Sequence, residues 1–332
     1  MPTFIKRRTQ PCDDLKAISV FISEKQQKWE ILRKEYHNLQ VMFANYLEAV
    51  EFPSQHIARR RYSTDAADAF YFLYDSKATC LAHIDEFRST AAGKLGGCPY
   101  CGLPENITLD HYLPRKRKAF PEFSILSSNL VPACSGCQNK KGHSYATHKK
   151  KLVTRAARFK PKLRAARATR QNCYSSPAQA KKTNRALPFR ILHPYIDSFL
   201  MHPVIRVIPD KKPGTFQVRA SGGLEKSKRT QLDLHLKKLD VSTRSGRAVR
   251  AARNSIIRDL SINNITFDRN SVLAELPRLL KSSLERCGLA PNTIEAAYVR
   301  SLMSQPCALD DLIQWSRERV EPNVLAARPV IL

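Results

Sequence analysis

The sequence predicts a mainly helical α+β protein, and three patterns point to that fold class. Apolar residues recur every three or four positions near both ends of the chain, which is the spacing of amphipathic helices. Two Cys-x-x-Cys pairs enclose a central block, and apolar and polar residues alternate around "DKKPG" (210–214) as in a β-hairpin. The chain therefore divides into a helical N-terminal region (1–92), a cysteine module (93–148), a basic tract (149–188) and a C-terminal region with a β-hairpin and helices (189–332).

Two helical stretches make up the N-terminal region. The first covers 13–51 and ends at Phe52-Pro53, because the residue before a proline is disfavoured in a helix. The second begins at Ser63–Asp65, whose short polar side chains are typical N-caps, and "GKLGG" (93–97) ends it. The region is expected to form a helical hairpin or a small bundle.

Nine cysteines occur in the chain, and four of them form two matched pairs that are 32 residues apart. Each pair can place two thiolates in the turn geometry that tetrahedral zinc requires, and four thiolates close its coordination shell. The other five are scattered singly, and an odd total without a secretory signal argues against a disulfide framework. We therefore predict one structural zinc ion held by Cys98, Cys101, Cys134 and Cys137.

The block between the two pairs contains the residues best suited to chemistry. "NITLDHY" alternates as a short strand that ends at Asp110-His111, and "NLVPAC" is typical of a second strand. "CSGCQNKKG" then begins a turn or a helix. Because zinc would tie the front of this block to its back, Asp110, His111, Asn129 and the amides at 138–139 are expected to lie close together.

The charge balance indicates a polyanionic partner. The chain has 56 Lys and Arg against 29 Asp and Glu, a formal charge of +27, and counterion release favours binding of such a surface to nucleic acid. A membrane surface would require a basic amphipathic helix with aromatic anchors, and the sequence has no convincing one. Without a signal-peptide core or an apolar run of about 18 residues, we expect a cytoplasmic protein.

Two groups of basic residues stand out. No acidic residue occurs between Glu122 and Asp197, an interval with 16 Lys or Arg. A solvated linker is the usual explanation of a charge run, but the lack of any compensating acid favours phosphate contact. A second stripe, in the helical pattern that follows Leu224, repeats every third residue: Arg244, Arg247, Arg250 and Arg253.

The block from Cys98 to about His143 resembles the HNH nucleases, the ββα-metal family, in the form with two zinc-binding Cys-x-x-Cys pairs. The resemblance rests on the order Cys-x-x-Cys, Asp-His, Pro, Asn-Leu-Val-Pro, Cys-x-x-Cys and Lys-Lys-Gly. It is similar to bacterial HNH proteins, several of which act in defence against phage. The resemblance implies a metal-dependent endonuclease that nicks or cuts duplex DNA, with His111 as general base, Asp110 as a ligand of catalytic Mg²⁺ (or Mn²⁺), and Asn129 holding the loop and orienting the imidazole.

One position departs from the family pattern. The family usually has His or Asn directly after the last cysteine, where this chain has Gln138, followed by Asn139. The longer glutamine holds an ion less rigidly, and His143 is a further candidate. The sequence narrowly favours Asn139 over Gln138 as the additional ligand of the catalytic ion.

Basic residues on both sides of the expected cleavage site could grip phosphates, although solubility is the ordinary role of such charges. The residues expected to bind nucleic acid are Arg115, Lys116, Arg117, Lys118, Lys140 and Lys141 in the cysteine module, and Lys149, Lys150, Lys151, Arg155 and Arg158 in the basic tract.

Other functions are also compatible with the sequence. Taken singly, Asp110 could cap a turn, His111 could lie in the core, and Asn129 could cap a strand end. The chain could be a zinc-stabilised nucleic-acid-binding protein without catalysis, or an RNase effector, since a basic surface does not distinguish the sugar. It could also be a nuclease subunit that requires an ATPase or sensor protein, with 13–90 and 224–318 as docking surfaces.

Overall fold

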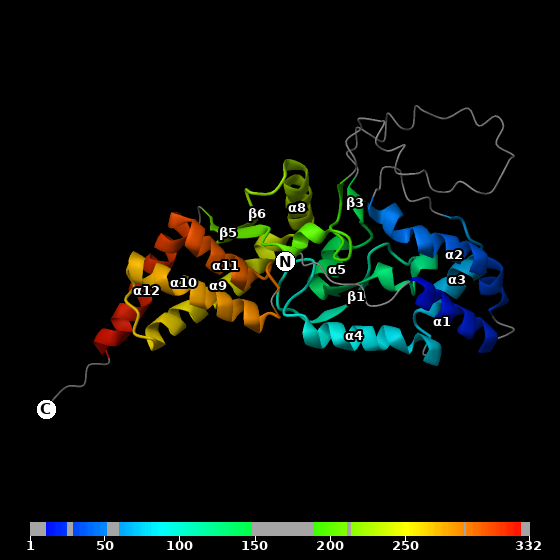
Figure 1. The fold of residues 1–332 in the computed structure, drawn as a ribbon, viewed down its shortest axis with the longest axis horizontal. Coiled ribbons are helices and arrows are strands. Elements are labelled where there is room, and N and C mark those ends of the chain that lie inside the picture. Colours follow the sequence, from blue (N-terminus) through cyan, green and yellow to red (C-terminus); the bar gives the residue numbers. More distant parts are fainter. Residues whose placement is uncertain are drawn as a thin grey trace.

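The computed structural model describes residues 11–24, 29–51, 60–76, 78–147, 189–210, 214–288 and 290–326. Helices dominate, with three two-stranded antiparallel sheets among these residues. Figure 1 shows the helices α1, α2 and α3 at one end of the molecule and α9 to α12 at the other, with β1 and α5 between them. The mainly helical α+β class is therefore confirmed. None of the described helices has the length and apolar character to span a bilayer.

The N-terminal region contains more helices than its apolar pattern indicates. The expected helix over 13–51 is instead two helices, α1 (Pro11–Glu24) and α2 (Glu30–Glu51), which pack against each other. Phe21 of α1 meets Trp29, just before α2, edge to face at a centroid distance of 5.2 Å. The single helix was wrong because the polar residues 23–28 fit a helix and a turn equally well.

The second expected helix is also divided, into α3 (Thr64–Leu73), a 3₁₀ turn (Thr79–Leu81) and α4 (Ala82–Lys94). Its predicted start is confirmed, since the Ser63 hydroxyl accepts a hydrogen bond from the Ala66 amide at 3.2 Å. Downstream of α3, Ser76 donates to the Leu73 carbonyl and helps to end the helix. The region is thus a small helical bundle in which α2 packs against both α1 and α3, and not a hairpin of two long helices.

The cysteine module is a β-hairpin followed directly by a helix. Both predicted strands are confirmed as β1 (Ile107–His111) and β2 (Leu130–Cys134), with Asp110 opposite Val131. Two 3₁₀ turns, Pro121–Phe123 and Ser127–Asn129, lie in the long connection between them. The helix α5 (Ser135–Lys141) starts at the end of β2, where the Cys134 side chain accepts a hydrogen bond from the Cys137 amide.

A short pair of antiparallel strands follows the cysteine module. The strand β3 (Ala146–Thr147) pairs with β4 (Phe189–Arg190), with Thr147 opposite Phe189. The segment after β4 is anchored in the core, because Arg190 forms a bidentate ion pair with Asp197 at 2.6 and 2.9 Å. The residues that flank the basic tract are therefore paired, while the tract itself falls outside the described residues.

The C-terminal region begins with the predicted hairpin, β5 (Ile205–Pro209) and β6 (Phe216–Ala220). Five helices follow it, and they are α8 (Lys226–Lys238), α9 (Val241–Ile262), α10 (Arg269–Arg286), α11 (Ile294–Ser304) and α12 (Pro306–Ala326). The helix α11 is largely buried and packs against β5, α9, α10 and α12. Asp240, in the left-handed conformation at φ 52°, separates α8 from α9.

Candidate functional site

The four paired cysteines come together as the sequence predicts. Cys98, Cys101, Cys134 and Cys137 are buried, and their sulfurs lie within 4.8 Å of one another. Backbone amides point at the sulfurs, with the Cys134 amide donating to Cys98 Sγ at 3.2 Å. A hydrogen bond with Cys134 is the main cause that lowers the pKa of Cys101 well below its ordinary value, while burial raises that of Cys98. This cluster could hold a structural metal such as zinc.

Asp110 lies at the end of β1 in the interface with α5. Its Oδ2 atom is 2.9 Å from the ammonium of Lys141 and accepts a hydrogen bond from Tyr100 at 3.3 Å. Burial raises the pKa of Asp110 even though Lys141 acts to lower it. Lys141 therefore offsets only part of the cost of burying the charged carboxylate, and a further cation nearby would stabilise the charged form.

His111 is held as a neutral imidazole. Its Nε2 atom lies 2.8 Å from the Ser124 carbonyl, which can only accept, so Nε2 carries the proton and Nδ1 is the acceptor. Tyr74, just after α3, packs edge to face on the ring at 4.6 Å. Burial lowers the pKa of His111 to about 3, so the ring is uncharged near neutral pH.

Asn129 fastens the connection between β1 and β2. Its Oδ1 atom accepts from the Tyr46 hydroxyl and from the Leu113 amide, both at 2.8 Å. Its Nδ2 atom donates to the carbonyls of Leu113 and Phe123 at 3.1 and 2.9 Å. Because Phe123 precedes Ser124, Asn129 positions the carbonyl that holds His111 without touching the imidazole.

We expect Asn129→Ala to loosen this connection and lower stability. The change leaves four groups in a buried site without partners, and each unmade buried hydrogen bond costs roughly 1–3 kcal/mol, so the free energy of unfolding should fall by about 3 kcal/mol or more. Asn139→Ala, on the exposed side of α5, is the matched control and should stay within about 0.5 kcal/mol. Urea denaturation measures both, and equal effects would contradict the role of Asn129.

The two adjacent amides point in different directions. Gln138 faces the hairpin, where its Nε2 atom donates to Thr108 Oγ1 at 2.6 Å and to the Ala133 carbonyl at 3.0 Å. Asn139 is exposed, and so is His143 beyond the end of α5. Since each residue turns a helix by about 100°, Gln138 shares the inward side with Lys141, whereas Asn139 does not. Asp110 thus has Gln138 on its side of α5, and the sequence preference for Asn139 stays a prediction.

Of the six residues expected to bind phosphate that the structure describes, four are paired within the protein. Arg115 stacks on Tyr71 and Tyr74 at 4.3 and 4.6 Å and forms a bidentate pair with Asp75. Arg117 pairs with Asp68, and Lys140 with Asp240. Lys141 is 1% exposed, which corrects its expected contact with phosphate. Lys116 and Lys118 are exposed, while Lys149, Lys150, Lys151, Arg155 and Arg158 lie outside the described residues.

The second arginine stripe is not one exposed face. Arg253 is buried and stacks on Trp315 at 4.0 Å, and Arg244 extends to the cysteine cluster, whereas Arg247 and Arg250 are exposed. A step of three residues turns a helix by about 300°, so nine residues place Arg244 and Arg253 on opposite sides. The four arginines therefore do not lie on one face of α9 as a continuous basic stripe.

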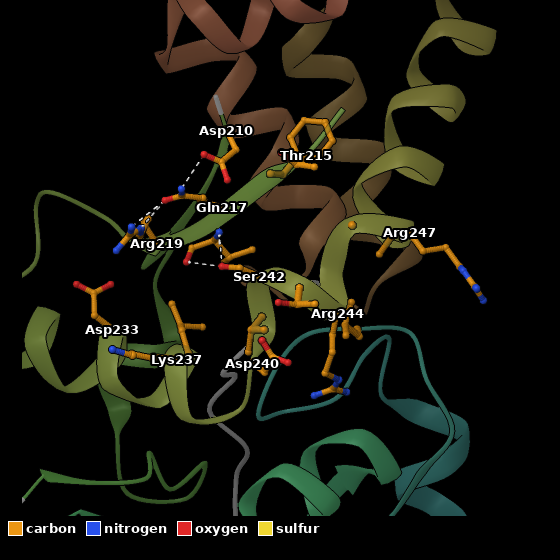
Figure 2. Close-up of a pocket in the computed structure, with 18 of the residues that line it drawn as sticks. Asp210, Thr215, Gln217, Arg219, Asp233, Lys237, Asp240, Ser242, Arg244 and Arg247 are labelled. Atoms are coloured by element: carbon orange, nitrogen blue, oxygen red, sulfur yellow. Dashed lines mark hydrogen bonds between the residues drawn. The ribbon is translucent and has the colours of Figure 1, made fainter. Parts of the chain in front are cut away.

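A groove of about 1510 Å³ lies where α8, α9 and the β5–β6 hairpin meet the segment after Cys101 (Figure 2). Its lining contains five basic residues (Arg219, Lys237, Arg244, Arg247 and Arg250) and four acidic residues (Glu105, Asp210, Asp233 and Asp240). These charges nearly balance, so the groove is not a concentrated cationic surface. Figure 2 shows Arg244 extending from α9 toward the teal segment of the cysteine module.

Sequence reasoning missed the partners that complete the site. Tyr74 and Arg244 reach it from outside the motif, and Tyr100 occupies a variable position between Cys98 and Cys101; a linear pattern carries no signal for such contacts. Ser124 contributes only its backbone carbonyl, for which no residue type is diagnostic.

Comparison with known proteins finds similarity over a limited segment. No family model and no solved structure matches this sequence. Protein ea31 of Escherichia phage lambda is 41% identical over 76 residues. That match covers 22% of this chain and 24% of ea31, so the chain spans about a quarter of the length of that protein. The likeness is thus one of a segment, and the case for an activity rests on the geometry of the hairpin, α5 and the cysteine cluster.

Proposed function

We propose that the chain is a metal-dependent HNH endonuclease that hydrolyses phosphodiester bonds of DNA, built around a zinc-stabilised ββα unit. The observation that carries the proposal is the pair at the end of β1. Asp110 has a carboxylate that Lys141 only partly compensates, and His111, the next residue of the strand, is a neutral imidazole whose Nδ1 atom is its acceptor. A hairpin, a short helix and four buried cysteines hold this pair, and the formal charge of +27 suits a phosphate substrate.

We assign His111 the role of general base. Because burial lowers its pKa to about 3, this role requires that a bound phosphate anion raise that pKa toward the working pH. Hydrolysis requires a group that removes a proton from the attacking water, and Nδ1 is the atom of the ring that can accept it. The Ser124 carbonyl, which accepts from Nε2, would stabilise the imidazolium once the proton arrives. The packing of Tyr74 limits ring rotation, so that Nδ1 keeps one direction.

The residues present fit a hard divalent cation. Asp110 supplies a carboxylate whose pKa burial has raised, and Gln138 supplies an amide on the same side of α5. Mg²⁺ commonly binds through one or two carboxylates together with water and substrate phosphates. When bound, Mg²⁺ or Mn²⁺ would stabilise charge on the phosphate and on the leaving oxygen. Lys141 holds Asp110 in place through its ammonium group.

Plasmid cleavage tests the proposal directly. The purified chain should convert supercoiled DNA to nicked or linear forms with Mg²⁺ or Mn²⁺ and should leave it intact with a chelator. Parallel reactions with structured RNA test the RNase alternative. Tight DNA binding without cleavage under all metal conditions would instead favour the non-catalytic binding protein and would overturn the nuclease proposal.

The basic tract is expected to bind phosphates of the DNA backbone. Changing five of its cations to Gln (Lys149, Lys150, Lys151, Arg155 and Arg158) should lower affinity for duplex DNA to a similar extent on all sequences. The slope of log affinity against log salt should flatten by roughly 0.9 for each phosphate that the variant no longer neutralises. Fluorescence anisotropy across a salt series, with divalent ions removed, measures both quantities.

A control for the reduced net charge comes from five exposed cations of the C-terminal helices: Lys226, Lys228, Arg229, Arg258 and Lys281. Their change to Gln alters the net charge equally but should leave the salt slope closer to that of the wild type. An unaltered slope in the tract variant would show that the tract is a solvated linker.

A further inference from the structure

Arg244 reaches the cysteine cluster from a distant part of the chain. Its Nη2 atom lies 3.1 Å from Cys134 Sγ and its Nη1 atom 3.3 Å from Cys137 Sγ. The same guanidinium pairs with Glu105 at 2.9 Å, and its side chain is 14% exposed. One planar group in the first turn of α9 therefore bridges both cysteines of the second pair and the segment that follows the first pair.

The net charge of a zinc-bound cluster explains why a cation at this place would be stabilising. Four thiolates around one Zn²⁺ sum to a net formal charge of about −2, since zinc ligands are deprotonated cysteines. A buried net charge is costly unless a counter-charge with hydrogen-bond donors lies beside it. The guanidinium supplies both, because it is always charged and its N–H groups already point at the sulfurs.

A glycine in the cysteine turn supports the same conclusion. A Cβ atom built on Gly136 would lie 2.3 Å from Arg244 Nη2, which is closer than real contacts allow. Gly136 does not have the positive φ at which a glycine is needed for its backbone. Its bare Cα instead leaves room for the guanidinium, so the turn between Cys134 and Cys137 is shaped for Arg244.

We propose that Arg244 is the outer charge partner of the zinc tetrathiolate, and that zinc thereby fixes the start of α9 on the cysteine module. A second contact near the same place, Lys140 Nζ to Asp240 Oδ2 at 2.8 Å, brings α5 and the residue before α9 together. Because both contacts involve the same two elements, occupancy of the cluster and docking of α9 are thermodynamically coupled. This inference rests on zinc binding and not on nuclease activity.

Zinc affinity tests the charge partnership. Competition with a chelator of known affinity should show that Arg244→Gln weakens zinc binding by about 10–100-fold, as removal of an outer-shell partner of a metal ligand does. Arg247→Gln, which removes an exposed charge from the same helix, should bind zinc as the wild type does. Arg244→Lys keeps the positive charge but lacks the planar guanidinium and its several N–H donors. Its zinc affinity should lie between that of Arg244→Gln and that of the wild type. Equal weakening by Arg247→Gln, or full affinity in Arg244→Gln, would overturn the proposal.

Hydrogen exchange of the wild type tests the coupling without any substitution. Removing zinc should speed amide exchange in the second turn of α9, whose amides donate to carbonyls of the first turn, while leaving the buried α11 protected. A second turn that stays as protected without zinc as with it would overturn the coupling. A chain that shows these effects but never cleaves DNA would refute the proposed nuclease and sustain this inference. A chain that cleaves DNA but binds zinc equally well with and without Arg244→Gln would support the proposed nuclease and refute this inference.

Discussion

Replacement of His111 by alanine should lower DNA cleavage by about 10²–10⁴-fold, the contribution expected of a positioned general base. The reason is the tautomer that the Ser124 carbonyl imposes, since Nδ1 is left as the ring atom that can accept a proton. Single-turnover cleavage of a labelled duplex at saturating enzyme measures the chemical step. A variant that keeps more than about a tenth of the wild-type rate would remove His111 from that role.

Controls separate chemistry from folding in this experiment. His111→Ala also removes the ring that packs on Tyr74, so zinc content and affinity for DNA in a chelator should be measured alongside. We expect both to remain close to those of the wild type. His37→Ala, on an exposed face of α2, controls for the removal of a histidine and should cleave normally. A His111→Ala protein without zinc or without DNA affinity would show that the side chain is chiefly structural.

Cys134→Ser should destabilise the cysteine module strongly, since structural zinc sites contribute folding energy directly, with apparent binding free energies of about 10–16 kcal/mol in small zinc modules. The Cys134 sulfur takes part in three interactions. It belongs to the cluster, it accepts a hydrogen bond from Arg244, and it caps the start of α5. We expect the decrease in the free energy of unfolding to exceed about 4 kcal/mol, beyond the range of most single substitutions. Denaturant unfolding followed by tryptophan fluorescence and by far-UV circular dichroism measures it.

Metal analysis supplies the second half of this prediction. The wild type should contain one zinc per chain, and Cys134→Ser should contain less. Cys307→Ser, an exposed cysteine of α12, is the matched control and should keep both zinc and stability. Pure and active protein without zinc would contradict the assignment of the metal.

Local signals explain what could be predicted from the sequence. The strands β1 and β2 follow from alternation, the start of α3 follows from Ser63, and the four cysteines follow from their spacing. The strands and the helix start depend on residues that are close in the chain. The cysteine cluster depends on the spacing that a tetrahedral metal site requires. The position of Asp110 and His111 at the end of a strand was predicted for the same reason, whereas their proposed roles come from the resemblance to HNH nucleases.

The remaining features depend on three-dimensional packing. The direction of Gln138 depends on the rotation of α5, which its start at Cys134 sets, and a start one residue later would have turned Asn139 inward. Lys141 is buried because Asp110 is its partner, although a lysine beside a glycine ordinarily indicates a surface. Arg244 reaches the cysteine cluster across more than a hundred residues, a distance at which periodicity carries no information.

The pairing of β3 with β4 sets the thermodynamic role of the segment between them. Because Thr147 lies opposite Phe189, that segment is tethered to the folded body at both ends, beside the cysteine module. A tether turns a second binding event into an intramolecular one, with effective concentrations that reach the millimolar range for short flexible linkers. In the proposed nuclease, phosphate contacts by the cations of this segment would therefore add local avidity for a nucleic acid bound at the ββα unit. Avidity of this kind accelerates rebinding after dissociation, so the proposed nuclease would cut one molecule repeatedly rather than meet many molecules once each.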